Sequence, residues 1–286
     1  MSTIQNIQAK VGVAADGLWG PKTRAAVAKA LGCKADDRAI QGKVGVAADG
    51  IIGTRSAAAI AAALGVEVST GRVHVFIDIG HTADRAREYP SSFSPDVWRG
   101  ERGMGIIQRL GFNPSVKDSL EHIMNTAIAG AVARHLEGLS VQVFDKPAME
   151  NDAEISAVIA EANAVRPRVF VSIHHNAQGG KAWERMGGTA SGHVVYHMAG
   201  RPSGRALARE VAECMDDFRH RNGMAGNRAD QVQEGSFAVI RKLDPQIAAC
   251  LVEVGFYDNI NDAAFIAEHI DGLGAAIAEG VRASLC

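Results

Sequence analysis

From residue 73 onwards, short and almost wholly apolar runs alternate with longer amphipathic or alanine-rich stretches. The apolar runs are rich in β-branched residues and end at glycine or polar residues, which is typical of buried strands. They predict strands at residues 73–78, 140–144, 169–173, 193–198 and 248–254, and the stretches between them predict helices at 115–136, 151–165, 203–219 and 261–285. This alternation predicts an α/β fold in which helices flank both faces of a twisted, mostly parallel sheet.

The first 66 residues follow a different pattern, a tandem repeat with an offset of 33 residues. Residues 7–32 and 40–65 each contain an amphipathic stretch, an Asp-Gly dipeptide, a second glycine and an alanine-rich stretch. Asp-Gly suits a turn that needs positive φ, so each unit is predicted to form a helix, a glycine loop and a second helix. Neither unit buries enough apolar surface alone, so the two should pack together. The chain thus divides into a small all-α domain (1–66), a linker (67–72) and the α/β domain (73–286).

Composition restricts the classes of function. The 286 residues carry a formal net charge of −2, which lacks the basic signature of a nucleic-acid-binding protein. No apolar run has the length of a membrane span, and the N-terminal residues lack the apolar segment of a signal peptide. We therefore expect synthesis in the cytoplasm, no membrane insertion and no nucleic-acid partner. The four cysteines are scattered, which predicts reduced thiols rather than a disulfide framework.

Four separate segments carry candidate chemistry. His81 and His174 follow the apolar runs 73–78 and 169–173, Glu121 lies on the helix predicted at 115–136, and Glu253 interrupts the apolar run 248–254. Functional groups gather at the carboxyl ends of strands in open α/β sheets, so these side chains are expected to converge. Two imidazoles and one carboxylate can hold a catalytic zinc ion, and a further glutamate can move the proton of the attacking water.

Each of these residues alone has an ordinary explanation. A single histidine at a strand end is usually a hydrogen-bonded structural residue, a glutamate on a helix is usually solvated, and a buried Glu253 could pair with an arginine. The four together, in this order, favour a hydrolytic metal site. Asp78 and Asn176 are candidates for residues that orient the histidine ligands without contacting the metal themselves.

These segments resemble the zinc-dependent N-acetylmuramoyl-L-alanine amidase family. The resemblance covers residues 73–285 and rests on Gly-His at 80–81, E-x-x-x-N at 121–125, SIHHNA at 172–177 and LVEVGF at 251–256. It implies one zinc ion bound by His81, Glu121 and His174, with Glu253 as the catalytic base. The family pattern selects His174 over the adjacent His175. The implied reaction is hydrolysis of the amide between the lactyl group of N-acetylmuramic acid and the L-alanine of the stem peptide.

The chain departs from the family pattern after the first histidine. The segment reads DIGHT where the family commonly has D-P-G-H-G-G, so Ile79 and Thr82 alter the loop. The long stretch 83–118 is either a substrate-covering lid or a loop with local packing.

The N-terminal repeat resembles the peptidoglycan-binding modules found beside many cell-wall hydrolases, in which D-G-x-x-G-x-x-T leads into a helix. The first copy matches this motif, and an exposed Trp19 beside its glycine loop is predicted to contact the wall. The second copy has Ile52 and Thr54 in place of Trp19 and Pro21. The alternative is that the repeat is only a stabilising helical cap.

The two resemblances together predict a peptidoglycan hydrolase of the phage endolysin type. Such an enzyme is made in the host cytoplasm, reaches the periplasm or cell wall through a holin-type pore, and has bacterial peptidoglycan as its partner. The alternatives are a zinc peptidase that cuts within the stem peptide, a bacterial autolysin with the same amidase activity, and a wall-binding protein with a decayed site.

Overall fold

The structure is a computed structural model that describes residues 3–48, 50, 52–66, 74–81, 120–145, 153–178, 188–224 and 231–285. Several sequence predictions lie outside the described residues: the turn residue Asp49, the linker 67–72, the stretch 83–118 and the start of the helix predicted at 115. Among the described residues, no helix is long and apolar enough to cross a membrane.

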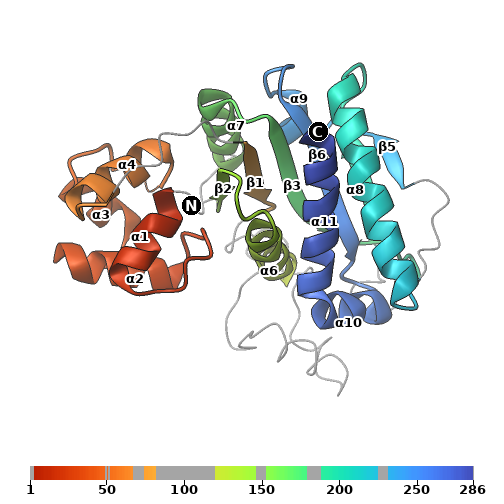
Figure 1. Cartoon of the computed structure of the whole chain (residues 1–286), viewed down its shortest axis with the longest axis horizontal. Coiled ribbons are helices and arrows are strands. Elements are labelled where there is room, and N and C mark those ends of the chain that lie inside the picture. The colour runs from red at the N-terminus through yellow and green to blue at the C-terminus, as the bar shows by residue number, and fades with distance from the viewer. Residues whose placement is uncertain are drawn as a thin grey trace.

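A six-stranded sheet with the order β2-β1-β3-β6-β4-β5 forms the centre of the α/β part (Figure 1). Strands β2, β1, β3 and β6 are parallel, β4 is antiparallel to β6, and β5 is parallel to β4. The predicted α/β fold with a mostly parallel sheet is therefore confirmed. The strands are β1 (Val75–Ile79), β2 (Val141–Phe144), β3 (Val169–Asn176), β4 (Val194–His197), β5 (Val232–Glu234) and β6 (Ala248–Phe256).

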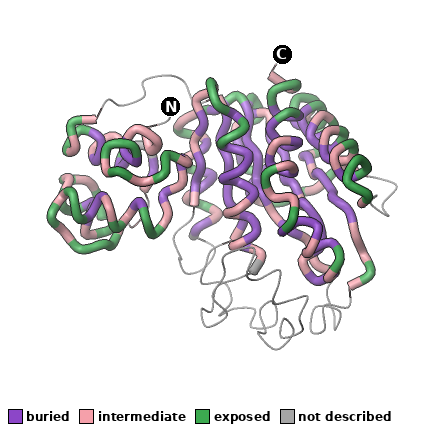
Figure 2. Tube along the Cα trace, turned by 60° about the horizontal axis from the view of Figure 1, so that its bottom comes forward, coloured by how far each residue is buried: buried purple, intermediate pink, exposed green. Residues whose placement is uncertain are grey.

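Helices cover both faces of this sheet and bury two separate apolar layers. On one face, α6 (Leu120–His135), α8 (Pro202–Arg221) and α11 (Ile270–Leu285) enclose a core that includes Ile77, Val171 and Val252. On the other face, α7 (Ala153–Val165) and α9 (Ala238–Arg241) pack over Phe76, Phe170 and Leu251. Figure 2 shows the resulting pattern, with buried residues along the strands and on the inner sides of the helices.

The single helix predicted at 261–285 is wrong, because two helices occupy this region. Helix α10 (Ile260–Glu268) ends at His269, and α11 begins at the next residue. The two helices pack on different elements. A Cβ at Gly255 of β6 would lie 2.8 Å from Ile266 of α10, whereas a Cβ at Gly274 of α11 would lie 2.3 Å from Ala131 of α6. The chain therefore changes direction between them.

Each repeat unit forms two helices joined by a glycine loop. The first unit contains α1 (Thr3–Val11) and α2 (Pro21–Leu31), and the second contains α3 (Asp37–Lys43) and α4 (Thr54–Ala63). These four helices share an apolar core of their own, which includes Ile7, Ile40 and Ile60. The two units therefore pack together as expected, while the exact domain limits 1–66, 67–72 and 73–286 stay predictions.

Equivalent glutamines organise the two glycine loops. Gln8 Oε1 accepts the N–H of Gly17 at 2.8 Å, and Gln41 Oε1 accepts the N–H of Gly50 at 2.7 Å. Both glutamines are 1% exposed, and both glycines have positive φ. The repeated Ile-Gln and Asp-Gly dipeptides thus have a structural role, since each glutamine fixes the turn of its own unit.

Trp19 is not exposed, so this part of the sequence analysis is wrong. The side chain is 7% exposed and belongs to the helical core. Its indole N–H donates to Asp37 Oδ1 at 2.8 Å, and Arg24 binds both oxygens of the same carboxylate at 2.8 Å. Trp19 is buried because it joins the first unit to α3 of the second unit.

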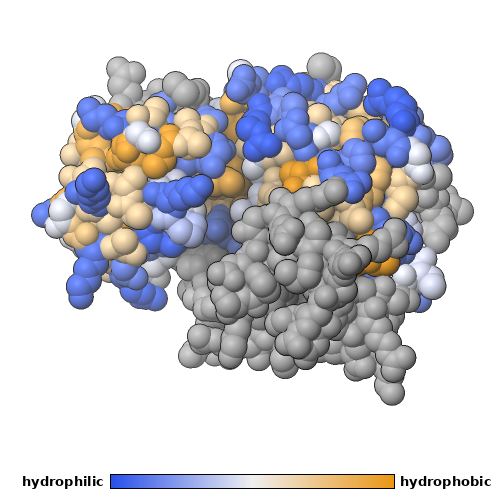
Figure 3. Space-filling view, turned by 90° about the horizontal axis from the view of Figure 1, so that it is seen from below, coloured by the Kyte–Doolittle hydropathy of each residue, from blue (hydrophilic) through white to orange (hydrophobic). Residues whose placement is uncertain are grey.

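The glycine loops also contact the α/β part. Leu18 packs against the core under α6, and a Cβ at Gly130 of α6 would lie 3.1 Å from the Cδ1 of Leu18. A Cβ at Gly53 would lie 2.8 Å from Oε2 of Glu161 on α7. Figure 1 shows the four helices beside α6 and α7, and Figure 3 shows apolar and hydrophilic residues mixed over the outer surface of these helices.

Candidate active site

The end of β1 brings its histidine directly against β3. Gly80 follows the strand, and its N–H donates to the carbonyl oxygen of Ile173 at 2.9 Å. A Cβ at this position would lie 2.5 Å from that oxygen and 2.6 Å from the ring of His174, so only glycine fits. His81 then has φ 57°, a left-handed conformation that is uncommon for a residue with a side chain. The two imidazole rings consequently lie 4.9 Å apart between centroids.

Helix α6 holds this loop through the carbonyl group of Gly80. Asn125 Nδ2 donates to this oxygen at 2.9 Å, and His122 Nδ1 lies 3.3 Å from it. The Oδ1 of Asn125 therefore accepts from His175 Nδ1, at 2.7 Å. Burial lowers the pKa of His175 to about 3, so this ring is neutral with its proton on Nδ1. The two adjacent histidines therefore have different partners: His174 lies beside Glu121, whereas His175 binds Asn125.

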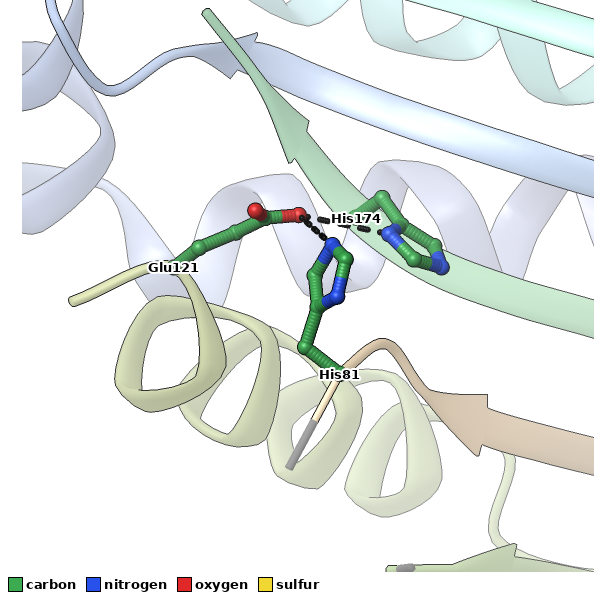
Figure 4. Close-up of side chains that lie close together, drawn as sticks. All are labelled: His81, Glu121 and His174. Atoms are coloured by element: carbon green, nitrogen blue, oxygen red, sulfur yellow. Dashed lines mark hydrogen bonds and ion pairs between the residues drawn. The ribbon is translucent and has the colours of Figure 1, made fainter. Parts of the chain in front are cut away.

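Glu121, His81 and His174 form a compact cluster. Glu121 Oε1 lies 3.1 Å from His81 Nε2 and 3.2 Å from His174 Nδ1. One nitrogen or oxygen atom from each residue lies within 4.8 Å of the others, and the side chains point toward one another from three elements (Figure 4). The three candidate ligands predicted from the sequence are therefore brought together.

The electrostatics of the cluster match the protonation states that metal ligands need. Burial opposes ionisation of Glu121, but the charges and hydrogen bonds of His81 and His174 outweigh it and hold the pKa of the carboxyl below its usual value. Burial lowers the pKa of His174, which favours the neutral imidazole. An ionised Glu121 carboxylate and a neutral His174 imidazole are the forms that bind a metal ion. Two nitrogens and one carboxylate oxygen fit the donor set of a catalytic zinc site.

Glu253 approaches the cluster from the neighbouring strand, since β6 pairs it with His174 of β3. Its Oε2 is buried and has no hydrogen-bond partner among the described residues. Burial, and next the charge of Glu121, raise the pKa of Glu253 well above its usual value. The alternative that Glu253 is a structural residue paired with an arginine is therefore not supported, because no described arginine contacts this oxygen.

Comparison with known proteins decides the family. A sequence model of the N-acetylmuramoyl-L-alanine amidases matches residues 75–283. The chain belongs to this family. It is a peptidoglycan hydrolase that cleaves the amide between N-acetylmuramic acid and the L-alanine of the stem peptide, as predicted from the sequence.

Solved structures share the fold of this amidase. An N-acetylmuramoyl-L-alanine amidase from Clostridium difficile 630 is 22% identical, with a TM-score of 0.53 over 75% of this chain and 98% of that chain. The amidase AmiC2 of Nostoc punctiforme is 24% identical, with a TM-score of 0.51 over 76% and 99% of the two chains. The catalytic domain of an endolysin targeting Clostridia difficile is 17% identical, with a TM-score of 0.53 over 74% and 97%. A search of curated proteins gives no match.

Asp78 and Asn176, the two residues predicted to orient the histidines of the amidase, each accept a hydrogen bond from another group. Asp78 Oδ2 accepts from the hydroxyl of Ser172 at 2.6 Å, and Asn176 Oδ1 accepts the N–H of Ala177 at 2.8 Å. Their orienting role stays a prediction. The sequence analysis did not predict that Asn125 and His122 contact Gly80. The available signal was the spacing of Asn125, which lies four residues after Glu121 and so shares its helix face.

We expect Gly80→Ala to lower the rate of peptidoglycan hydrolysis by about 100-fold, the size of effect that a 1 Å misplacement produces. The added Cβ would push against Ile173 and the ring of His174. Release of dye from labelled peptidoglycan measures the rate, and circular dichroism checks the fold. Gly42→Ala is the matched control, because nothing lies within 4 Å of a Cβ there. Equal activity of the two variants would contradict the close approach at Gly80.

Proposed function

We propose that the amidase depends on one zinc ion per chain, bound by His81, Glu121 and His174, and that Glu253 is its catalytic base. The observation that carries the proposal is the convergence of three ligand atoms within 4.8 Å of one another. The buried Oε2 of Glu253, which has no hydrogen-bond partner within the described part of the chain and lies on the strand next to His174, supports the assignment of the base.

The chemistry follows from the roles of these side chains. Zinc, when bound, supplies Lewis-acid polarisation of the scissile carbonyl group and makes water more acidic. Glu253 takes the proton from the attacking water as the water oxygen bonds to the lactyl carbonyl carbon. The carbon–nitrogen bond then breaks, and Glu253 delivers this proton to the departing amine of L-alanine. Among the described residues no donor occupies Oε2 of Glu253, and the raised pKa of this carboxyl makes its ionised form a stronger base toward the water proton.

We expect Glu253→Gln to lower kcat by about 10²–10⁴-fold while the protein keeps its zinc. His174→Ala should instead lose the metal, because it removes one of three ligands. Zinc content by atomic absorption and hydrolysis of a soluble muramoyl peptide separate the two effects. His220→Ala, which changes an exposed histidine on α8, is the control and should retain both properties. Loss of zinc from Glu253→Gln would make Glu253 a ligand and overturn its role as base.

We propose further that the N-terminal repeat binds peptidoglycan. The support is its resemblance to wall-binding modules in the D-G-x-x-G-x-x-T segment. Because Trp19 is buried and Leu18 packs against the catalytic part, the contact would use other surfaces of the four helices. Holding the enzyme on a polymer raises the local concentration of cleavable bonds.

Removal of residues 1–66 tests this role. The remaining chain should cleave a soluble muramoyl peptide at a rate similar to the full chain. Its activity on whole sacculi at low enzyme concentration should fall by about 100-fold, the lower range of an avidity effect. An equal loss on both substrates would favour the alternative of a stabilising helical cap.

We propose an endolysin as the biological role, with synthesis in the host cytoplasm and action in the periplasm or cell wall. A bacterial autolysin with the same activity is the second candidate, since solved structures of similar fold include an endolysin domain and amidases of bacteria. Expression in a Gram-negative host separates the two. An endolysin should lyse the cells when a holin-type pore is co-expressed, whereas lysis without the pore would indicate export by the cell.

A further inference from the structure

A cavity of about 180 Å³ opens beside the zinc-ligand cluster, on the face of the sheet that α7 and α9 cover. His81 and His174 form one side of it, and Ile155, Val158 and Leu251 form an apolar wall. We call this cavity the α7–α9 pocket. Because it shares two side chains with the cluster, a substrate group placed there would lie directly next to the scissile bond.

Apart from the two histidines, the polar side chains that line the pocket are acidic. Glu154 of α7 lines the pocket, is 6% exposed, and has an Oε2 without a hydrogen-bond partner among the described residues. Asp78 of β1 also lines it and accepts a hydrogen bond from Ser172. A buried carboxylate oxygen without a donor is costly, so a ligand that donates a hydrogen bond would stabilise it. A ligand that carries a carboxylate would be repelled.

Phe237 adds an aromatic surface to this pocket. It is 40% exposed and is the one large hydrophobic side chain exposed to this extent among the described residues. Tyr196 contacts its ring in an edge arrangement, with centroids 4.9 Å apart. A Cβ at Gly235 would lie 2.6 Å from the same ring, so glycine makes room for it. The ring is thus held in place by its neighbours while part of it faces outward.

An aromatic ring and an apolar wall, beside an acceptor that no described residue satisfies, suit a sugar that bears an acetamido group. The apolar face of a sugar ring packs on an aromatic ring, an acetamido methyl fills an apolar recess, and its N–H donates to a carboxylate. The scissile amide has this sugar on one side and the stem peptide on the other. The peptide carries free carboxylates beyond its alanine, which Asp78 and Glu154 would repel.

We propose that the α7–α9 pocket binds the N-acetylmuramic acid residue, with the sugar ring on Phe237 and the acetamido N–H donating to Glu154. The inference rests on the proposed zinc amidase mechanism. It assigns the sugar to the α7–α9 side of the cluster and places the stem peptide away from it.

Two substrates with the same peptide test the assignment. One is N-acetylmuramoyl tripeptide, and the other is the D-lactoyl tripeptide, which contains the scissile amide but no sugar ring. The measured quantity is the ratio of their kcat/KM values. We expect wild type to prefer the muramoyl substrate, and Glu154→Met and Phe237→Leu each to lower this ratio by about tenfold, because each removes one contact to the sugar. Glu137→Met, at an exposed position after α6, should leave the ratio at the wild-type value.

A binding measurement gives a second readout that does not depend on turnover. Saturation-transfer NMR of N-acetylmuramoyl tripeptide with the Glu253→Gln protein should show the acetamido methyl group as the most strongly saturated signal. Adding Glu154→Met or Phe237→Leu should weaken that signal relative to those of the peptide. Strongest saturation on the peptide methyl groups would overturn the proposal even if a variant failed to fold.

Other outcomes of the kinetic test would separate failure of the sugar assignment from failure of the zinc mechanism. If both variants slow the two substrates equally, the pocket has no role in sugar recognition and the inference is wrong. If they change the discrimination between stem peptides instead, the occupant is the peptide. If zinc-loaded wild type hydrolyses neither substrate, the proposed mechanism itself fails, which is distinguishable from failure of the sugar assignment.

Discussion

The active site depends on the close approach of β1 to β3 at Gly80. The glycine N–H binds the carbonyl of Ile173, and the ring of His174 occupies the space that a side chain at Gly80 would need. The left-handed conformation of the next residue then turns His81 toward His174. The remaining hydrogen-bonding group of Gly80, its carbonyl oxygen, is held by Asn125 of α6. Because Glu121 lies one helical turn before Asn125, this single contact also sets the carboxylate against both rings.

Burying two carboxylates side by side opposes folding, so the strand that carries Glu253 has to be held by other means. A fully buried ion pair between Arg219 of α8 and Asp262 of α10 holds the backbone at the end of β6. Arg219 donates to the carbonyl of Val254 at 3.4 Å, and Asp262 accepts the N–H of Phe256 at 2.8 Å. A buried pair adds little net stability, but it fixes the groups that it contacts. The backbone just after Glu253 is therefore fixed, while its side-chain Oε2 has no partner among the described residues.

The sequence was sufficient for the parallel strands and the ligand cluster because strand ends and helix faces follow from local periodicity. His81, His174 and Glu253 each lie at or near the end of an apolar run, and parallel strands bring such ends to one edge. Features that depend on distant partners were not predictable. The indole of Trp19 binds Asp37 of the other repeat unit, β4 runs antiparallel to β6, and β5 is only three residues long. Likewise, nothing near Glu154 or Phe237 in the sequence indicates that α7 and α9 place them at one cavity.

The N-terminal repeat combines a symmetric and an asymmetric feature, and the difference bears on its function. Gln8 and Gln41 make the same contact in both units, so the glycine loops are a property of each unit alone. Trp19 has no counterpart in the second unit, where Ile52 takes its place, and its partner Asp37 belongs to α3 of that second unit. The loops also contact α6 and α7 through Leu18 and Gly53. Part of the glycine-loop motif that resembles a ligand-binding loop therefore has a structural role. Through Leu18 it packs the N-terminal module against α6, the helix that carries Glu121. A wall strand bound elsewhere on the module would then be held in a fixed relation to the catalytic cluster.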